Sequence, residues 1–199
     1  MNSEKSILER KRELRGAARE RLALMTPAAR VEASRQLRAR LAARPEWTSA
    51  GSVLFFASLG EEPDIWDLLS LAISGGKVAA LPRYDVKGGE YVACRVRDLE
   101  TDIQAGRFGI REPAPRCGAE PWKRLDLILV PGVAFDLRCR RLGRGNGFYD
   151  RILAAVEGRT CGVSFDEQIV SEIPLEPHDV ALNSILTPTH WIEPSTVGI

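Results

Sequence analysis

The chain has 199 residues, of which 44% are hydrophobic and 28% charged, and its formal net charge is +1. This composition is typical of an ordinary folded protein, and the length suits one sizeable core, so we expect a single domain over residues 1–199. The small net charge argues against nucleic acid as a partner. No apolar run reaches the length of a membrane span, so a membrane partner is not expected either.

The cysteines are few and far apart in the sequence. Cys94, Cys117, Cys139 and Cys161 form no Cys-x-x-Cys pair, and the chain contains only two histidines, so a zinc site is not expected. Free thiols in a reducing compartment are the simpler interpretation. The charged start of the chain lacks the apolar segment of a signal peptide, and we therefore predict a cytoplasmic protein.

Two helices are predicted first, followed by alternating strands and helices. Thr26-Pro27 starts the second helix, with threonine as the N-cap and proline in the first turn. The helices are expected over residues 6–25, 26–43, 65–73 and 148–156, and the strands over residues 52–57, 77–81, 91–96, 125–130, 160–165 and 184–186. This order favours an α/β fold with a mainly parallel sheet flanked by helices, a Rossmann-like three-layer arrangement with two N-terminal helices. Ligands of such sheets bind beyond the carboxyl ends of the strands.

The first helix carries two cations on its apolar face. Lys11 and Arg15 share a helical stripe with the apolar residues Ile7, Leu14, Ala18 and Leu22. A cation on a buried face is costly unless it is paired. A carboxylate from elsewhere, extension of the side chain to the surface, or an anionic ligand would each satisfy these two residues.

A glycine-rich segment between a predicted strand and a predicted helix is the strongest functional signal. It runs from Arg141 to Arg151 and contains Gly143, Gly145 and Gly147. Glycines let the backbone approach an anion, successive N–H groups form a nest, and the helix start adds positive charge. The spacing fits neither a Walker A loop nor a dinucleotide fingerprint. A phosphate-binding loop and a tight turn with solvated arginines both remain open.

Acidic residues near this segment and after the first strand have two possible roles. Asp150 opens the predicted helix and Asp179 lies in a loop, where each would ordinarily act as a capping or turn residue. Next to a phosphate nest, the same two carboxylates would suit Mg²⁺. Asp64 is a natural helix N-cap, and the neighbouring Glu61 and Glu62 are expected to be solvated.

Several motifs together resemble the 5-formyltetrahydrofolate cyclo-ligase (5,10-methenyltetrahydrofolate synthetase) family. The most specific match is Val130 to Asp136 followed by Arg141-Leu142-Gly143, two further glycines and Tyr149-Asp150-Arg151. Weaker matches follow in the order of the family, at residues 11–15, 81–84, 108–113, 162–165, Gln168 and 174–179.

The resemblance implies an ATP-dependent ligase with Mg²⁺. The expected reaction activates the formyl oxygen of 5-formyltetrahydrofolate with the γ-phosphoryl group of ATP, and attack by N10 then yields 5,10-methenyltetrahydrofolate, ADP and phosphate. Folate and ATP are the expected small-molecule partners, and the chain is expected to be a monomer or a weak homodimer. A non-catalytic nucleotide- or folate-binding paralogue of the same fold is the alternative.

The resemblance also implies roles for individual residues. Lys11 and Arg144 are the expected catalytic residues, and Asp150 and Asp179 the expected metal ligands. The folate is expected at Leu59, Asp64 and the loop residues Arg144, Gly145, Asn146, Gly147 and Phe148. The ATP-binding set is Lys11, Arg12, Arg15, Arg141, Leu142, Gly143, Arg144, Gly145, Asn146, Gly147, Phe148 and Tyr149. The aromatic rings of Phe148, Tyr149 and Tyr84 would pack either on the folate rings or in the core.

Three positions depart from the family pattern. Cys139 replaces a common glycine, Asn146 replaces the middle glycine of the loop, and Ile65 replaces a common threonine. If the backbone at Cys139 has a positive φ, a cysteine there is strained. The surrounding arginines would lower the pKa of an exposed Cys139 thiol, which predicts that this cysteine is alkylated first and that ATP slows its alkylation.

Overall fold

The computed structural model describes residues 6–106, 109–176 and 179–194. Phe108 and His178, which belong to two of the family-like motifs, lie outside these ranges. The α-helices are α1 Ile7–Ala23, α2 Pro27–Ala42, α3 Pro45–Ser49, α4 Trp66–Ser74 and α5 Phe148–Ala155, and the 3-10 helices are η2 Trp122–Arg124 and η3 Asp166–Gln168. No helix in these ranges is both long enough and apolar enough to cross a bilayer.

An eight-stranded sheet forms the centre of the molecule, in the order β13-β12-β10-β7-β1-β2-β3-β6. The five strands from β12 to β2 are parallel to one another, and antiparallel strands extend both edges. These strands are β1 Ser52–Leu54, β2 Val78–Asp85, β3 Glu90–Val96, β6 Ala119–Glu120, β7 Leu127–Pro131, β10 Arg159–Val163, β12 Ser184–Leu186 and β13 Trp191–Ile192. The predicted mainly parallel sheet is therefore confirmed.

Two small sheets accompany the central one. β8 Ala134–Asp136 pairs with β9 Arg141–Leu142 and with β11 Ile169–Val170. In this three-stranded sheet, β8 and β9 flank the turn that precedes the glycine-rich loop. β4 Ile103–Ala105 and β5 Arg111–Pro113 form a separate antiparallel pair.

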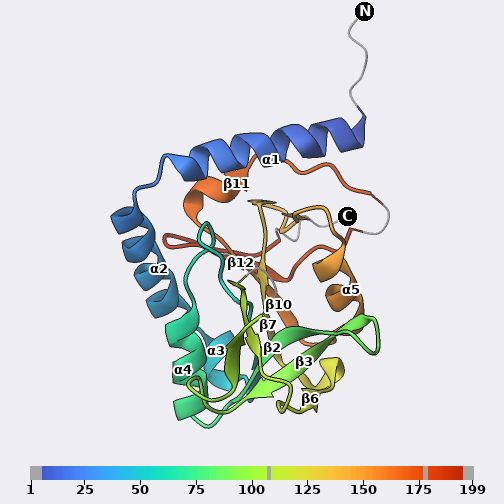
Figure 1. Ribbon diagram of the computed structural model, residues 1–199. Helices are drawn as coiled ribbons and strands as arrows, with labels where there is room; N and C mark the ends of the chain where they lie inside the picture. The colour runs from blue at the N-terminus through green and yellow to red at the C-terminus, as the bar shows by residue number, and fades with distance from the viewer. Residues whose placement is uncertain (1–5, 107–108, 177–178, 195–199) are drawn as a thin grey trace, which may run out of the picture.

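Helices cover both faces of the central sheet, which confirms the three-layer arrangement. Figure 1 shows α2, α3 and α4 along one side of the strands and α5 on the other side. Helix α1 lies across one end of the molecule, where it contacts η3 and β8. Of the two N-terminal helices, α2 therefore lies in a layer beside the sheet, whereas α1 lies across one end of the molecule.

The boundaries of the first two helices follow from their caps. The side chain of Ser6 accepts a hydrogen bond from the N–H of Glu9, and the Glu9 side chain returns to the N–H of Ser6, which makes a capping box. The side chain of Thr26 accepts from the N–H of Ala29, and Pro27 occupies the first turn of α2, as the sequence predicts.

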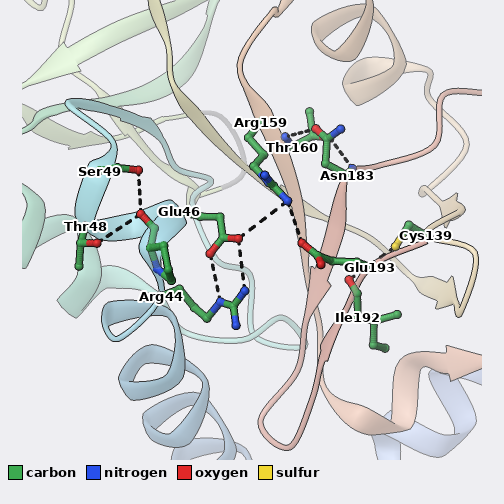
Figure 2. A network of polar contacts seen from close by, with 11 residues as sticks. Arg44, Glu46, Thr48, Ser49, Cys139, Arg159, Thr160, Asn183, Ile192 and Glu193 are labelled. Carbon is green, nitrogen blue, oxygen red and sulfur yellow. Dashed lines mark hydrogen bonds and ion pairs between the residues drawn. The ribbon is translucent and has the colours of Figure 1, made fainter. Parts of the chain in front are cut away.

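An ion-pair network fixes the amino-terminal end of β10 (Figure 2). Arg159, the first residue of this strand, lies 2.7 Å from Glu193 and 3.8 Å from Glu46. Arg44 donates two hydrogen bonds to the Glu46 carboxylate, and its guanidinium lies 4.3 Å from the centre of the Trp191 ring. The network therefore joins α3, β10 and the end of the described chain.

Candidate active site

A narrow pocket lies beyond the carboxyl ends of β1, β7 and β10, the place where ligands bind in open parallel sheets. Gly132 and Val133 follow β7, Glu61 and Glu62 follow β1, and Gln168 follows β10. The other lining residues come from α1 and from the glycine-rich loop; they are Arg19, Leu22 and Arg144. Four segments of the chain thus meet α1 at one place.

The glycine-rich loop has the backbone shape that its glycines predict. Gly145 and Gly147 have positive φ values of 100° and 63°, and Gly147 is the N-cap of α5. Gly143 lies so close to the Arg141 guanidinium that an added Cβ would be 2.7 Å from Arg141 Nη1. The side chain of Leu142 is buried in the core, so only the backbone of this residue is available to a ligand.

The charged residues of α1 reach two different segments. Lys11 is buried, and its Nζ lies 2.8 Å from Glu176 and 2.6 Å from Asp179. Arg15 is partly buried and donates from Nε to the carbonyl oxygen of Gly143 at 2.9 Å. Arg12 is exposed. Carboxylate pairing, one of the alternatives left open by the sequence, is therefore found for Lys11, while the phosphate role of these cations stays a prediction.

Glu62 lines the pocket, as do Glu61 and Arg19, and none of the three is predicted from the sequence as a site residue. One carboxylate oxygen of Glu62 accepts from the N–H of Leu59 at 3.0 Å, and the other accepts from Arg144 Nη2 at 2.9 Å. The Glu62 side chain is only 9% exposed, which corrects the expectation that it is solvated. One feature of the sequence could have indicated this position. Glu62 lies three residues after Leu59, and at this spacing a glutamate side chain can turn back and accept from the Leu59 N–H.

Asp64 and Leu59 take different positions in the same loop. Asp64 is exposed, and its carboxylate accepts from the N–H of Trp66 at 3.0 Å, near the start of α4. Leu59 is partly buried, and neither residue lines the pocket. Their contacts with folate stay predictions, whereas Glu61 and Glu62 of the same loop both line the pocket.

A buried carboxylate supports the turn that precedes the glycine-rich loop. Asp136 has no exposed surface and accepts from the backbone N–H groups of Arg138, Arg140 and Ile173. It also pairs with the buried Arg140 guanidinium at 2.6 Å. One side chain thus connects the end of β8, the turn and the segment after β11.

The two candidate metal ligands both contact cations. Asp150, in the first turn of α5, pairs with Arg141, and Asp179 pairs with Lys11. Within the described ranges, no group of three or more His, Cys, Asp and Glu side chains is arranged to hold a metal ion. A binding role for Asp150 and Asp179 therefore depends on a metal ion that brings other ligands with it, such as substrate phosphates.

An aromatic cluster extends from the β2–β3 hairpin to the start of α5. Ring centroids lie 5.1 Å apart for Tyr84 and Tyr91, 3.8 Å for Tyr91 and Phe148, and 4.8 Å for Phe148 and Tyr149. Tyr149 is buried, and burial, together with the nearby Glu62 charge, holds the pKa of its hydroxyl well above the usual range. Tyr84 is 47% exposed, so the cluster leads from the core to the surface.

Cys139 is strained but not exposed. Its φ of 58° places it in the left-handed region, the one described non-glycine residue with a positive φ. Its side chain is fully buried, and its Sγ lies 3.7 Å from the carbonyl oxygen of Ile192 (Figure 2). Burial raises the pKa of the Cys139 thiol to about 11. The structure therefore contradicts the basis for early alkylation of Cys139, because the thiol is buried and the charges of Asp136 and Glu193 raise its pKa further.

Comparison with known proteins assigns the chain to a family. The family model described as the 5-formyltetrahydrofolate cyclo-ligase family matches residues 7–188. The 5-formyltetrahydrofolate cyclo-ligase of Mycolicibacterium smegmatis is 38% identical over 149 residues, covering 72% of this chain and 77% of the relative. The enzyme of the same name from Escherichia coli K12 is 30% identical over 176 residues, covering 86% and 96%.

Solved structures agree with this assignment. The NMR structure of Aquifex aeolicus 5,10-methenyltetrahydrofolate synthetase superposes with a TM-score of 0.82 at 30% identity, covering 92% of each chain. The synthetase of Mycoplasma pneumoniae has a TM-score of 0.70 at 16% identity, covering 89% of this chain and 98% of the other, and supports the fold alone. These relatives confirm the prediction of a ligase, and the chain belongs to the 5-formyltetrahydrofolate cyclo-ligase family.

Proposed function

We propose that this chain converts 5-formyltetrahydrofolate to 5,10-methenyltetrahydrofolate with consumption of ATP. The γ-phosphoryl group of ATP would be transferred to the formyl oxygen, N10 would attack the activated carbon, and phosphate would leave with that oxygen. The observation that carries the proposal is the meeting of Arg144, Glu62 and the glycine-rich loop at a pocket beyond the carboxyl edge of the sheet. Phosphoryl transfer requires mainly positioning and charge neutralisation, which these residues can supply.

The phosphates of ATP would be bound at the start of α5. The loop amides from Gly143 to Gly147 and the N-terminus of α5 form an anion-binding surface, and positive φ values at Gly145 and Gly147 support that shape. Arg144 is 48% exposed and would contact the transferred phosphoryl group, with Lys11 and Arg15 approaching from α1. The proposed set of cations is completed by the exposed Arg12 and by Arg141, whose side chain is 6% exposed.

The folate would occupy the side of the pocket formed by the loop after β1. Glu62 supplies a carboxylate that can accept hydrogen bonds from the amino and ring N–H groups of the pterin. We include it beside Leu59, Asp64 and Phe148 as a folate-binding residue. The partly buried Phe148 ring lies within the aromatic cluster, where it can pack on a flat ligand.

Mg²⁺ would be held by Asp150 and Asp179 together with the phosphates. The donor chemistry fits, because Mg²⁺ typically binds one or two carboxylates plus substrate oxygens, and both carboxylates retain some exposure. When bound, the ion would neutralise phosphate charge during transfer. In its absence, Arg141 and Lys11 neutralise the two carboxylates. We further propose a cytoplasmic monomer or weak homodimer.

Absorbance of the methenyl product tests this proposal. The purified chain is mixed with 5-formyltetrahydrofolate, with and without ATP and Mg²⁺, and an Arg144→Gln variant is measured in parallel. We expect turnover that requires both ATP and Mg²⁺ and that falls by about 10²–10³-fold in the variant, the range observed when one transition-state donor is removed. Saturable binding of folate or ATP without turnover would support a non-catalytic paralogue instead.

A further inference from the structure

Lys11 is held between two carboxylates from one distant segment. Its Nζ donates to Glu176 Oε2 at 2.8 Å and to Asp179 Oδ2 at 2.6 Å, and the Lys11 side chain is 7% exposed. The same Asp179 oxygen accepts from the backbone N–H of Glu176 at 2.8 Å. The two carboxylates are thus fixed relative to each other, and they enclose the ammonium group.

This arrangement gives the group of three side chains a net charge of −1. The two carboxylates also act on Arg15, one helical turn further along α1: burial lowers the pKa of the Arg15 guanidinium, whereas Asp179 and Glu176 partly offset this effect. The side chains of Glu176 and Asp179 are 28% and 15% exposed, against 7% for Lys11, so a polyphosphate that approaches Lys11 meets the two carboxylates before the ammonium group. A polyphosphate that carries a divalent cation meets less repulsion, because the cation is attracted to the same carboxylates.

We propose that Glu176 is a specificity-determining residue of the nucleotide site, which neutralises Lys11 and so makes the site discriminate against metal-free polyphosphate. This inference rests on the proposed function, since it requires that Lys11 contact ATP. Asp179 is one of the two proposed metal ligands and would contact a bound cation directly. Glu176 adds a second negative charge, which disfavours a metal-free nucleotide more than a metal-complexed one.

Nucleotide binding measured by calorimetry tests this role apart from catalysis. Dissociation constants for ATP are measured in excess EDTA and in excess Mg²⁺ for the wild type and for Glu176→Gln, which keeps the size of the side chain and an oxygen for Lys11. Glu172→Gln is the matched control, because it removes one negative charge from the same segment but pairs with Arg140. The test uses the full chain, and circular dichroism verifies folding.

We expect Glu176→Gln to bind metal-free ATP about five- to tenfold more tightly, at the lower end of typical coupling between sites. The affinity for ATP with Mg²⁺ should change less than twofold, and Glu172→Gln should behave as the wild type in both conditions. The gain should disappear when Lys11→Met is added to Glu176→Gln. Unchanged or weaker binding of metal-free ATP in folded Glu176→Gln contradicts the inference alone. A wild type that binds no ATP in either condition contradicts the proposed function, and this inference with it.

Discussion

At the residue scale, Cys139 occupies a backbone position that suits glycine. Its φ of 58° costs a residue with a Cβ about 1–2 kcal/mol. The sequence pointed to this position because glycine is common there in the family, but exposure could not be read from it. Exposure depends on Ile192 and Leu182, which contact Cys139 across more than 40 residues of sequence.

We predict that Cys139→Gly is more stable than Cys139→Ala by about 1 kcal/mol, the reverse of the usual order of these two residues. Both variants lose the buried thiol and differ only in the Cβ, whose strain at a positive φ is expected to outweigh the gain from its burial. Chemical denaturation of the two variants measures it. A Cys139→Ala variant that equals or exceeds Cys139→Gly would show that the positive φ is not maintained in solution.

The different roles of Glu62 and Asp64 could not be predicted from the sequence. Both are acidic and lie two positions apart in one loop, so composition and spacing do not distinguish them. The structure does, because Glu62 turns back to the N–H of Leu59 and reaches Arg144. Asp64 accepts from the N–H of Trp66, but the N-cap of α4 is Ile65 and not the predicted Asp64. That difference arises from a contact with the glycine-rich loop 82 residues away.

At the element scale, the turn between β8 and β9 depends on Asp136. Its carboxylate accepts from three backbone N–H groups and pairs with buried Arg140. Removing one partner of a buried pair leaves an uncompensated charge. We predict that Asp136→Asn lowers the free energy of unfolding by about 3–5 kcal/mol, as measured by denaturant titration.

Glu172→Gln is the control for this prediction. Glu172 pairs with the same Arg140, at 3.3 Å, but its side chain is 55% exposed. Removing an exposed ion pair is expected to lower the free energy of unfolding by less than about 1 kcal/mol. Equal losses for Asp136→Asn and Glu172→Gln would mean that the buried pair does not stabilise the turn.

Elements with local signals were predictable from the sequence, and elements that depend on distant partners were not. The capped helices α1 and α2 and the apolar strands of the central sheet carry their own patterns. The strands β8, β9 and β11 have two or three residues each and exist only because they pair with one another. The glycine-rich pattern pointed to a loop that contributes Arg144 to the pocket, but not to the small sheet beside that loop.

At the scale of the whole molecule, the network in Figure 2 predicts a dependence of stability on pH. Burial raises the pKa of Glu46, but the hydrogen bonds from Arg44 and the charges of Arg44 and Arg159 outweigh this, so the folded-state pKa lies below the usual 4.5. A lowered folded-state pKa stabilises the protein above the unfolded pKa, and this contribution is lost as the pH falls through the folded value.

We therefore predict that Glu46→Gln is less stable than the wild type at pH 7, by at most about 1 kcal/mol, and that the difference narrows as the pH falls below about 4. Denaturant titrations at a series of pH values measure it. Glu157→Gln, which removes an exposed partner of Lys123, is the control and should show a smaller effect. A difference that grows on acidification would contradict the assigned direction of the Glu46 pKa.

Activation by phosphoryl transfer determines where the formyl oxygen goes during turnover. If ATP activates that oxygen by phosphoryl transfer, the oxygen must leave bound to phosphorus when the ring closes. The decisive measurement uses 5-formyltetrahydrofolate labelled with a heavy oxygen isotope in the formyl group, ATP, Mg²⁺ and the wild-type chain, followed by mass analysis of the released phosphate. The proposed mechanism predicts one labelled phosphate for each methenyl product formed. Unlabelled phosphate with continued product formation would contradict it.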